Sequence, residues 1–255
     1  MIRQPAAAGL FYPADRDVLA ARVDSLLDEA GRRPDGDVRG LVAPHAGYEY
    51  SGRVAASAFA IAPDVAEVVV LLGPSHFVPL TGLAVSGAQA WATPLGDVAV
   101  SSRLRSAALG AGAVVDDEPH APDHALEVEL PFLQRACGEL EILPVAVGRT
   151  DPVDVARLLE ALDALVVVST DLSHYLDDAA ARRIDRETAA AVVRRDPDAI
   201  GDRAACGVFA LRGLLEHAGR ANLAVELLDL RTSADATGDR DRVVGYGAFA
   251  ARAVA

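Results

Sequence analysis

The sequence predicts an α/β fold, in which one domain spanning residues 1–255 has a central, mostly parallel sheet flanked by helices. Three apolar runs of strand length, rich in β-branched residues, predict buried strands at 38–43, 67–72 and 164–168. Stretches with helical spacing alternate with these runs, which is typical of a sheet covered by helices on both faces. Neither a linker nor a tandem repeat divides the chain, so one domain is expected.

Local signals define the elements of the N-terminal half. Apolar residues recur at helical spacing from Leu19 to Leu27, and Gly31 follows as a helix stop. The strand at 67–72 is followed by a loop rich in glycine and proline, which is typical of a turn. In chain order the expected elements are helix 17–30, strand 38–43, helix 53–61, strands 67–72, 82–86 and 97–100, and helix 101–111.

The C-terminal half has similar signals. An acidic stretch with two prolines, Asp116 to Asp123, precedes a predicted helix. Asp151 and Pro152 predict another helix start, with the carboxylate as N-cap and proline at the first helical position. The expected elements are helix 123–137, strand 140–147, a helix from 152, strand 164–168, helices 177–195 and 203–218, and strands 223–231 and 242–252, with a turn at 237–239.

Composition excludes several classes of protein. Hydrophobic residues make up 51% of the chain and aromatic residues only 5%, so the core is expected to consist mainly of alanine, valine and leucine. No apolar run reaches the roughly 18–20 residues of a membrane span. The N-terminus lacks the pattern of a signal peptide, which predicts a cytoplasmic location. The net charge of −13 argues against a nucleic-acid partner, and all of the positive side-chain charge comes from arginine because lysine is absent.

Three of the six histidines follow the three apolar runs. His45 comes after 38–43, His76 after 67–72, and His174 after 164–168. Ligands and catalytic groups gather at the carboxyl ends of strands in open α/β sheets. The spacing therefore predicts that the three regions form one site, with a metal site as the first interpretation. Taken singly, each histidine could instead cap a strand end through hydrogen bonds to the backbone.

Several neighbours could assist these histidines. Ser75 could orient the ring of His76, whereas a serine nucleophile is disfavoured because no G-x-S-x-G elbow is present. Asp171 lies three residues before His174 and would face the same way if a helical turn began there. The carboxylate could then fix the tautomer of the imidazole. This pair could serve in acid–base chemistry, as metal ligands, or only as an N-cap.

The stretch from His120 to Glu129 contains the next candidates. Pro122 separates His120 from His124, so His120 is expected at the surface and His124 in the first helical turn. The helix dipole there would depress the pKa of His124 and favour its neutral form. Glu127, one turn on, could reach the same face as His124. Glu129 is expected to be solvated.

The two cysteines are too few for a disulfide framework. Cys206 precedes what looks like a buried helix start, where a thiol has a lowered pKa and can ligate a metal. The alternative is that Cys206 is a small buried hydrophobic residue. That reading is preferred for Cys137, at a helix end. His217, late on an amphipathic helix, is expected at the surface or beside the helix C-terminus.

Several segments, in order and across nearly the whole chain, resemble one family. The first is the N-terminal stretch from Arg3 to Pro13, RQPAAAGLFYP. The others are APHAGY at 43–48, GPSH at 73–76, HALEVELPFL at 124–133, STDLSHY at 169–175 and ACG at 205–207. Together they resemble the Memo family, whose prokaryotic members are called protein B of the AmmeMemoRadiSam system.

This resemblance implies a fold similar to that of the class III, extradiol-type non-haem iron dioxygenases. It implies a metal site made of His45, His76 and Cys206. It also implies that His124, Asp171 and His174 line the same pocket and carry catalytic roles. Three further residues are assigned to the pocket wall: Tyr48, Ser75 and Glu127. Iron and copper are both associated with eukaryotic relatives, and a cysteine ligand favours copper, zinc or electron-rich iron. Catechol ring cleavage does not follow from the fold.

Three functions remain open at this point. The first is a metal-dependent oxidoreductase, with iron or copper, acting on an unknown small molecule or modified peptide. The second is a binding or accessory protein that works with the radical SAM and AMMECR1-like proteins that the family name implies. The third is a hydrolase that uses zinc to activate water.

Overall fold

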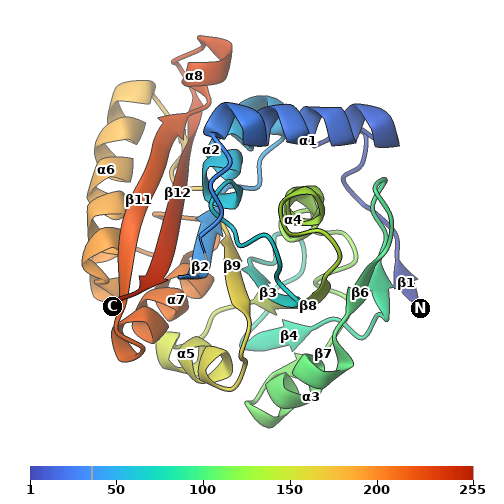
Figure 1. Cartoon of the computed structure of the whole chain (residues 1–255). Coiled ribbons are helices and arrows are strands. Elements are labelled where there is room, and N and C mark those ends of the chain that lie inside the picture. The colour runs from blue at the N-terminus through green and yellow to red at the C-terminus, as the bar shows by residue number, and fades with distance from the viewer. Residues whose placement is uncertain (36, 255) are drawn as a thin grey trace.

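The computed structural model describes residues 1–35 and 37–254, and its centre is a mixed sheet (Figure 1). Twelve strands are present in that part of the chain, and most of them hydrogen-bond in the order β1-β5-β6-β8-β3-β9-β2-β12-β10. Strand β11 pairs with β12, whereas β4 pairs with β8 and β7 pairs with β4. The strands are β1 (Ile2–Arg3), β2 (Val38–Ala43), β3 (Val68–Gly73), β4 (Leu83–Val85), β5 (Ala90–Trp91), β6 (Val98–Val100), β7 (Val114–Val115), β8 (Glu141–Val147), β9 (Leu165–Ser169), β10 (His174–Leu176), β11 (Leu223–Thr232) and β12 (Val243–Ala253).

The centre of the sheet is parallel. Strands β6, β8, β3, β9 and β2 run in one direction as neighbours. Every residue of β3 and β9 is buried, as expected for parallel strands covered on both faces. Leu72 pairs with Val168, and Val42 also pairs with Val168, so the carboxyl ends of β2, β3 and β9 are level. The predicted α/β architecture with a mostly parallel centre is confirmed.

Helices cover both faces of the sheet (Figure 1). Side chains alternate across it, so Val69 and Leu71 join the core cluster beneath α1, α2 and α4, whereas Val70 and Leu72 join the cluster beneath α3, α5 and α7. The eight helices in the described residues are α1 (Arg16–Ala30), α2 (Tyr48–Phe59), α3 (Ser102–Gly110), α4 (Leu130–Cys137), α5 (Pro152–Glu160), α6 (Asp178–Arg194), α7 (Val208–Arg220) and α8 (Ala234–Thr237).

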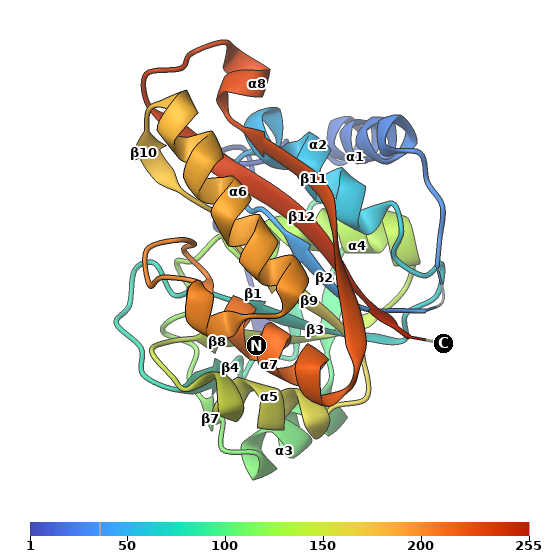
Figure 2. The same cartoon turned by 90° about the vertical axis from the view of Figure 1, so that its left-hand side faces the viewer.

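The C-terminal strands extend the sheet in the antiparallel sense. Strands β11 and β12 form a long hairpin, and β12 pairs with β2. Helix α6 crosses this hairpin (Figure 2). No helix in residues 1–35 or 37–254 is both long and apolar enough to cross a membrane.

Local signals explain most helix boundaries, including one that differs from expectation. The Asp151 carboxylate accepts a hydrogen bond from the Val153 amide, and Gly31 is left-handed after α1, so both predicted caps are confirmed. The helix predicted from residue 123 begins only at Leu130, after a 3-10 turn at Glu127–Glu129. Because Pro131 lacks an amide hydrogen, it is tolerated in a first helical turn and not in a helix interior.

Candidate metal centre

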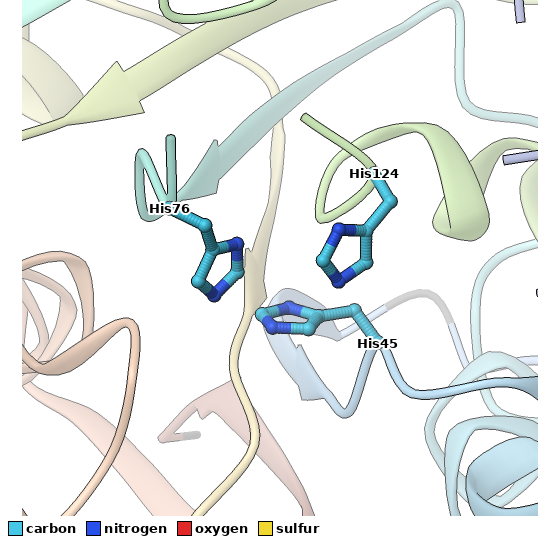
Figure 3. Close-up of side chains that lie close together, drawn as sticks. All are labelled: His45, His76 and His124. Carbon is cyan, nitrogen blue, oxygen red and sulfur yellow. The ribbon is translucent and has the colours of Figure 1, made fainter. Parts of the chain in front are cut away.

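Three imidazoles converge at the carboxyl edge of the parallel strands. His45 follows β2, His76 follows β3, and His124 lies in the loop before the 3-10 turn at Glu127–Glu129. The three rings point toward one another (Figure 3). One ligand atom from each lies within 4.8 Å of the others. Three nitrogen donors this close together could hold one metal ion.

His45 is the most firmly held of the three. Its backbone amide donates to Asp171 Oδ1 at 2.9 Å, and its Nδ1 lies 2.8 Å from Ser169 Oγ. The ring is buried, and burial together with the neighbouring His76 and His124 holds the pKa of His45 well below its usual value. His45 is therefore neutral at neutral pH, with Nε2 directed toward the centre.

Cys206 lies beside His45 although 161 residues separate them in sequence. Its Sγ is 3.2 Å from His45 Nε2, and it accepts a hydrogen bond from the Asp171 amide at 3.2 Å. The sequence predicted a lowered pKa at a helix start, but burial and the nearby Asp171 raise the pKa of Cys206 to about 12. The expected lowering is therefore wrong for the protein without a metal, because burial disfavours the thiolate. A coordinated metal ion would favour the thiolate again.

His76 is held by Asp123, a residue to which the sequence analysis gave no role in the site. The Asp123 carboxylate accepts from the His76 amide at 2.6 Å, and its Oδ1 lies 3.1 Å from His76 Nδ1. Burial by itself would raise the pKa of Asp123, but hydrogen bonds from His76 and from the Ala125 amide lower it to about 2. An ionised carboxylate on Nδ1 fixes the ring and leaves Nε2 free for a metal. The only sequence signal is that Asp123 adjoins His124.

His124 is placed by stacking. Its ring stacks on Phe11 with the centroids 4.1 Å apart, and on His76 at 5.0 Å. Burial is the main cause that lowers the pKa of His124, with a smaller contribution from His76. The sequence correctly predicted that the pKa of His124 is lowered. It assigned the wrong cause, the helix dipole, because α4 begins only at Leu130.

Asp171 and His174 do not form the expected helical turn. Residues 171–173 are not helical, and His174 opens strand β10. The Asp171 carboxylate holds the His45 amide, and burial raises the pKa of Asp171 to about 7 despite that hydrogen bond. Burial also lowers the pKa of His174, and His76 adds to this lowering. His174 thus lies close enough to the centre to interact electrostatically with His76.

The three predicted pocket residues direct their polar atoms elsewhere. The Tyr48 hydroxyl donates to the Val128 carbonyl at 2.6 Å, and the Ser75 hydroxyl donates to the Val78 carbonyl at 2.6 Å. Glu127 is fully buried and ties down the N-terminal segment, accepting hydrogen bonds from Arg3 Nη1, the Ala6 and Ala7 amides, and the Tyr12 hydroxyl. That clamp holds the segment containing Phe11 and so supports the Phe11–His124 stack.

Two predictions for the stretch from His120 to Glu129 are wrong, because both side chains expected in solvent are buried. His120 was expected at the surface, but it is buried, with Nε2 3.1 Å from the Ala84 carbonyl and its ring against Trp91. Glu129 was expected to be solvated, but it is buried and its Oε1 lies 2.7 Å from Ser169 Oγ. The error at Glu129 follows from assuming one helix from residue 123, because the chain forms a 3-10 turn at Glu127–Glu129 that directs this side chain inward.

Comparison with known proteins identifies the family of this chain. A family model described as Memo-like protein matches residues 3–250. A "MEMO1 family protein" of Methanosarcina mazei is 35% identical over 97% of this chain and 98% of its own length. A protein of Thermotoga maritima with the same description is 37% identical over 96% of this chain and 98% of its own length. Another, of Archaeoglobus fulgidus, is 32% identical over 98% of this chain and 100% of its own length. Because these matches span the chain from the N-terminal segment to β12, the chain belongs to the Memo family.

Proposed function

We propose that this chain is a redox-active metal protein in which His45, His76 and Cys206 hold one iron or copper ion. The observation that carries the proposal is the meeting of imidazole and thiol donors from three separate segments. Two ligands at about 2.0–2.3 Å from one ion lie roughly 3–4 Å apart. His45 Nε2 and Cys206 Sγ are 3.2 Å apart, which suits such an ion. Bound iron or copper would supply electron exchange with a substrate.

The remaining polar side chains suit a supporting role in such a reaction. His124 and His174 have pKa values lowered mainly by burial, so each is neutral at neutral pH and can accept a proton. Asp171 holds the loop of His45 through its amide hydrogen bond. We propose a small molecule or a modified peptide as the substrate.

A zinc-dependent hydrolase is the second candidate, and one observation favours it. The donor atoms of His45, His76 and His124 lie within 4.8 Å of one another. Three histidines with an open fourth position are a catalytic zinc set. In this arrangement Cys206 would lie beside the centre and not in it. The two proposals therefore differ in whether Cys206 or His124 is the third ligand.

The test is elemental analysis of protein purified without added metal, for the wild type and three variants. The variants are His76→Ala, Cys206→Ala and His124→Ala. His217→Ala, on α7, is the matched control because it replaces a histidine outside the centre. We expect about one equivalent of iron or copper in the wild type and the control. His76→Ala and Cys206→Ala should lose most of it, and His124→Ala should retain it.

Other outcomes decide between the alternatives. Zinc that is lost in His124→Ala and kept in Cys206→Ala would replace the redox proposal with the hydrolase. Absence of metal in all five proteins, even after anaerobic reconstitution, would overturn both. That result, with co-purification of a radical SAM or AMMECR1-like protein, would favour an accessory role.

A further inference from the structure

A buried carboxyl group lies directly behind the His45 ring and has no role in the site described so far. The Glu129 side chain is buried, with a relative exposure of 1%. Its Oε1 is 2.7 Å from Ser169 Oγ, and its Oε2 has no hydrogen-bond partner. Ser169 Oγ in turn lies 2.8 Å from His45 Nδ1. The three side chains thus form a continuous chain, Glu129–Ser169–His45, that ends at the metal centre.

The number of hydrogens in this chain constrains its protonation. Ser169 Oγ has three neighbours at hydrogen-bond distance: His45 Nδ1, Glu129 Oε1 and, at 2.7 Å, the Ala125 carbonyl. A hydroxyl group has one hydrogen to donate and two lone pairs that accept. The Ala125 carbonyl can only accept, so it takes the single hydrogen of Ser169. The other two neighbours must then donate to Ser169 Oγ.

Each of these donors has only one way to satisfy that requirement. His45 donates if its proton is on Nδ1, and Glu129 donates if its carboxyl group is protonated on Oε1. If Glu129 were ionised instead, either its Oε1 or the Ala125 carbonyl would face Ser169 Oγ at 2.7 Å without a hydrogen between them. The unpartnered Oε2 points the same way, because an ionised carboxylate in that position would leave a buried charge unsolvated.

We propose that Glu129 is kept as a neutral carboxylic acid, and that Ser169, which gives its one hydrogen to the Ala125 carbonyl, fixes His45 in the tautomer that carries its proton on Nδ1. That tautomer leaves the lone pair of His45 Nε2 free toward Cys206 and a metal. Ser169 is therefore a positioning residue for the centre. The inference rests on the proposed function only in its last step, because the tautomer is a property of the protein without metal.

The groups around Glu129 support its neutral state. Burial is the main cause that raises the pKa of Glu129. The hydrogen bond with Ser169 lowers it by less than burial raises it, and the nearby Asp171 raises it further. Tyr48 also lies close enough to interact electrostatically with Glu129, but its hydroxyl donates to the Val128 carbonyl and not to the carboxyl group. Neither of these neighbours supplies a positive charge that would stabilise an ionised Glu129.

The experiment compares metal-free wild type with Glu129→Gln and Ser169→Ala. Glutamine is neutral, and its amide nitrogen can donate to Ser169 as the proposed carboxylic acid does. Alanine at position 169 removes the hydroxyl group that holds His45 Nδ1. Glu139→Gln is the matched control, because Glu139 is exposed. Infrared difference spectra at neutral pH report a protonated carboxyl group, and nitrogen NMR of the His45 ring reports its tautomer.

The protonated-carboxyl absorption of the wild type should be kept in Glu139→Gln and should lose one component in Glu129→Gln. Asp171, whose pKa is about 7, contributes a second component that all of these proteins share. The His45 ring should carry its proton on Nδ1 in the wild type and in Glu129→Gln, and should populate both tautomers in Ser169→Ala. Metal affinity should fall about 10–100-fold in Ser169→Ala and stay unchanged in Glu129→Gln.

A protonated-carboxyl absorption that is unchanged in Glu129→Gln, or a wild-type His45 ring protonated on Nε2, would overturn the inference. If Ser169→Ala does not fold, the spectra of wild type and Glu129→Gln decide. If the spectra are as expected but no metal binds to any of these proteins, the proposed function fails while the role of Ser169 in setting the tautomer stands.

Discussion

Two histidines of the centre, His45 and His76, are oriented through the ring nitrogen that does not face it. Ser169 holds Nδ1 of His45, and Asp123 holds Nδ1 of His76. Partners of this kind fix the ring and its tautomer and raise its basicity as a ligand. They differ in charge: the pKa of Asp123 is about 2, so it is ionised, whereas Ser169 is neutral. The two imidazoles are therefore expected to differ as donors.

Asp123→Asn tests the charged partner. Asparagine keeps the size of the side chain but removes the negative charge on His76 Nδ1, so metal affinity should fall about 10–100-fold. The measurement is a competition titration with a chelator. Asp163→Asn is the control, because Asp163 is exposed. Equal affinities for the two variants would show that Asp123 does not support His76 as a ligand.

Glu129 should also make stability depend on pH. Its folded-state pKa is raised, mainly by burial, so the folded chain retains a proton that the unfolded chain releases. Its contribution is fully present below the unfolded pKa and is lost as pH rises toward the folded pKa. The unfolding free energy of wild type relative to Glu129→Gln should fall by about 1.4 kcal/mol per pH unit in that interval. Urea unfolding between about pH 5 and 7 measures it, and a constant difference would contradict the prediction.

At the scale of elements, glycines bring α7 close to the sheet and so place Cys206. A Cβ atom on Gly207 would lie 2.8 Å from the Ser169 carbonyl oxygen, and one on Gly213 would overlap the Val155 side chain on α5. Only hydrogen fits at either position. The close approach sets the start of α7 against the end of β9, where the Cys206 amide donates to the Asp171 carbonyl.

Gly213→Ala should therefore destabilise the protein although alanine favours helix formation. The overlap with Val155 forces α5 and α7 apart, with an expected cost of about 1–3 kcal/mol. Gly219→Ala is the control in the same helix, since a Cβ atom there meets nothing within 4 Å. It should be neutral or stabilise by up to about 1 kcal/mol. Urea unfolding measures both, and similar effects of the two substitutions would rule out tight packing at Gly213.

For the molecule as a whole, one sheet separates two apolar layers that depend on each other. Val69 and Leu71 pack into one apolar layer and Val70 packs into the other. Because the same central strands contribute side chains to both layers, neither layer stays packed if these strands unfold. The metal centre lies at the edge where these strands end. Global stability and the geometry of the centre are therefore coupled through the same strands.

This arrangement predicts a single cooperative unfolding transition. Thermal unfolding followed by the fluorescence of Trp91, which is buried in the layer beneath α1, α2 and α4, should coincide with unfolding followed by circular dichroism. The calorimetric and van't Hoff enthalpies should agree. A fluorescence change at clearly lower temperature than the change in circular dichroism would indicate that this layer unfolds separately.

The fold was more predictable than the site. Buried strands such as β3 and β9 have continuous β-branched runs, and an N-cap such as Asp151 is a local signal, so both could be identified from neighbouring residues. The contact between Asp123 and His76 could not, because the two residues are 47 positions apart and no local pattern pairs them. The burial of Glu129 was missed for a related reason: periodicity assigned a helix where the chain forms a 3-10 turn.

The sequence by itself determined that the chain forms a parallel-centred α/β sheet and that His45 and His76 meet at one edge. Both conclusions depend on short-range patterns and on the alignment of parallel strands. Only the tertiary structure decided which groups hold the rings of these histidines, namely Asp123 and Ser169. It also decided that the pKa of Cys206 is raised and not lowered. The physical reason is that desolvation and hydrogen bonding depend on which distant segments pack together.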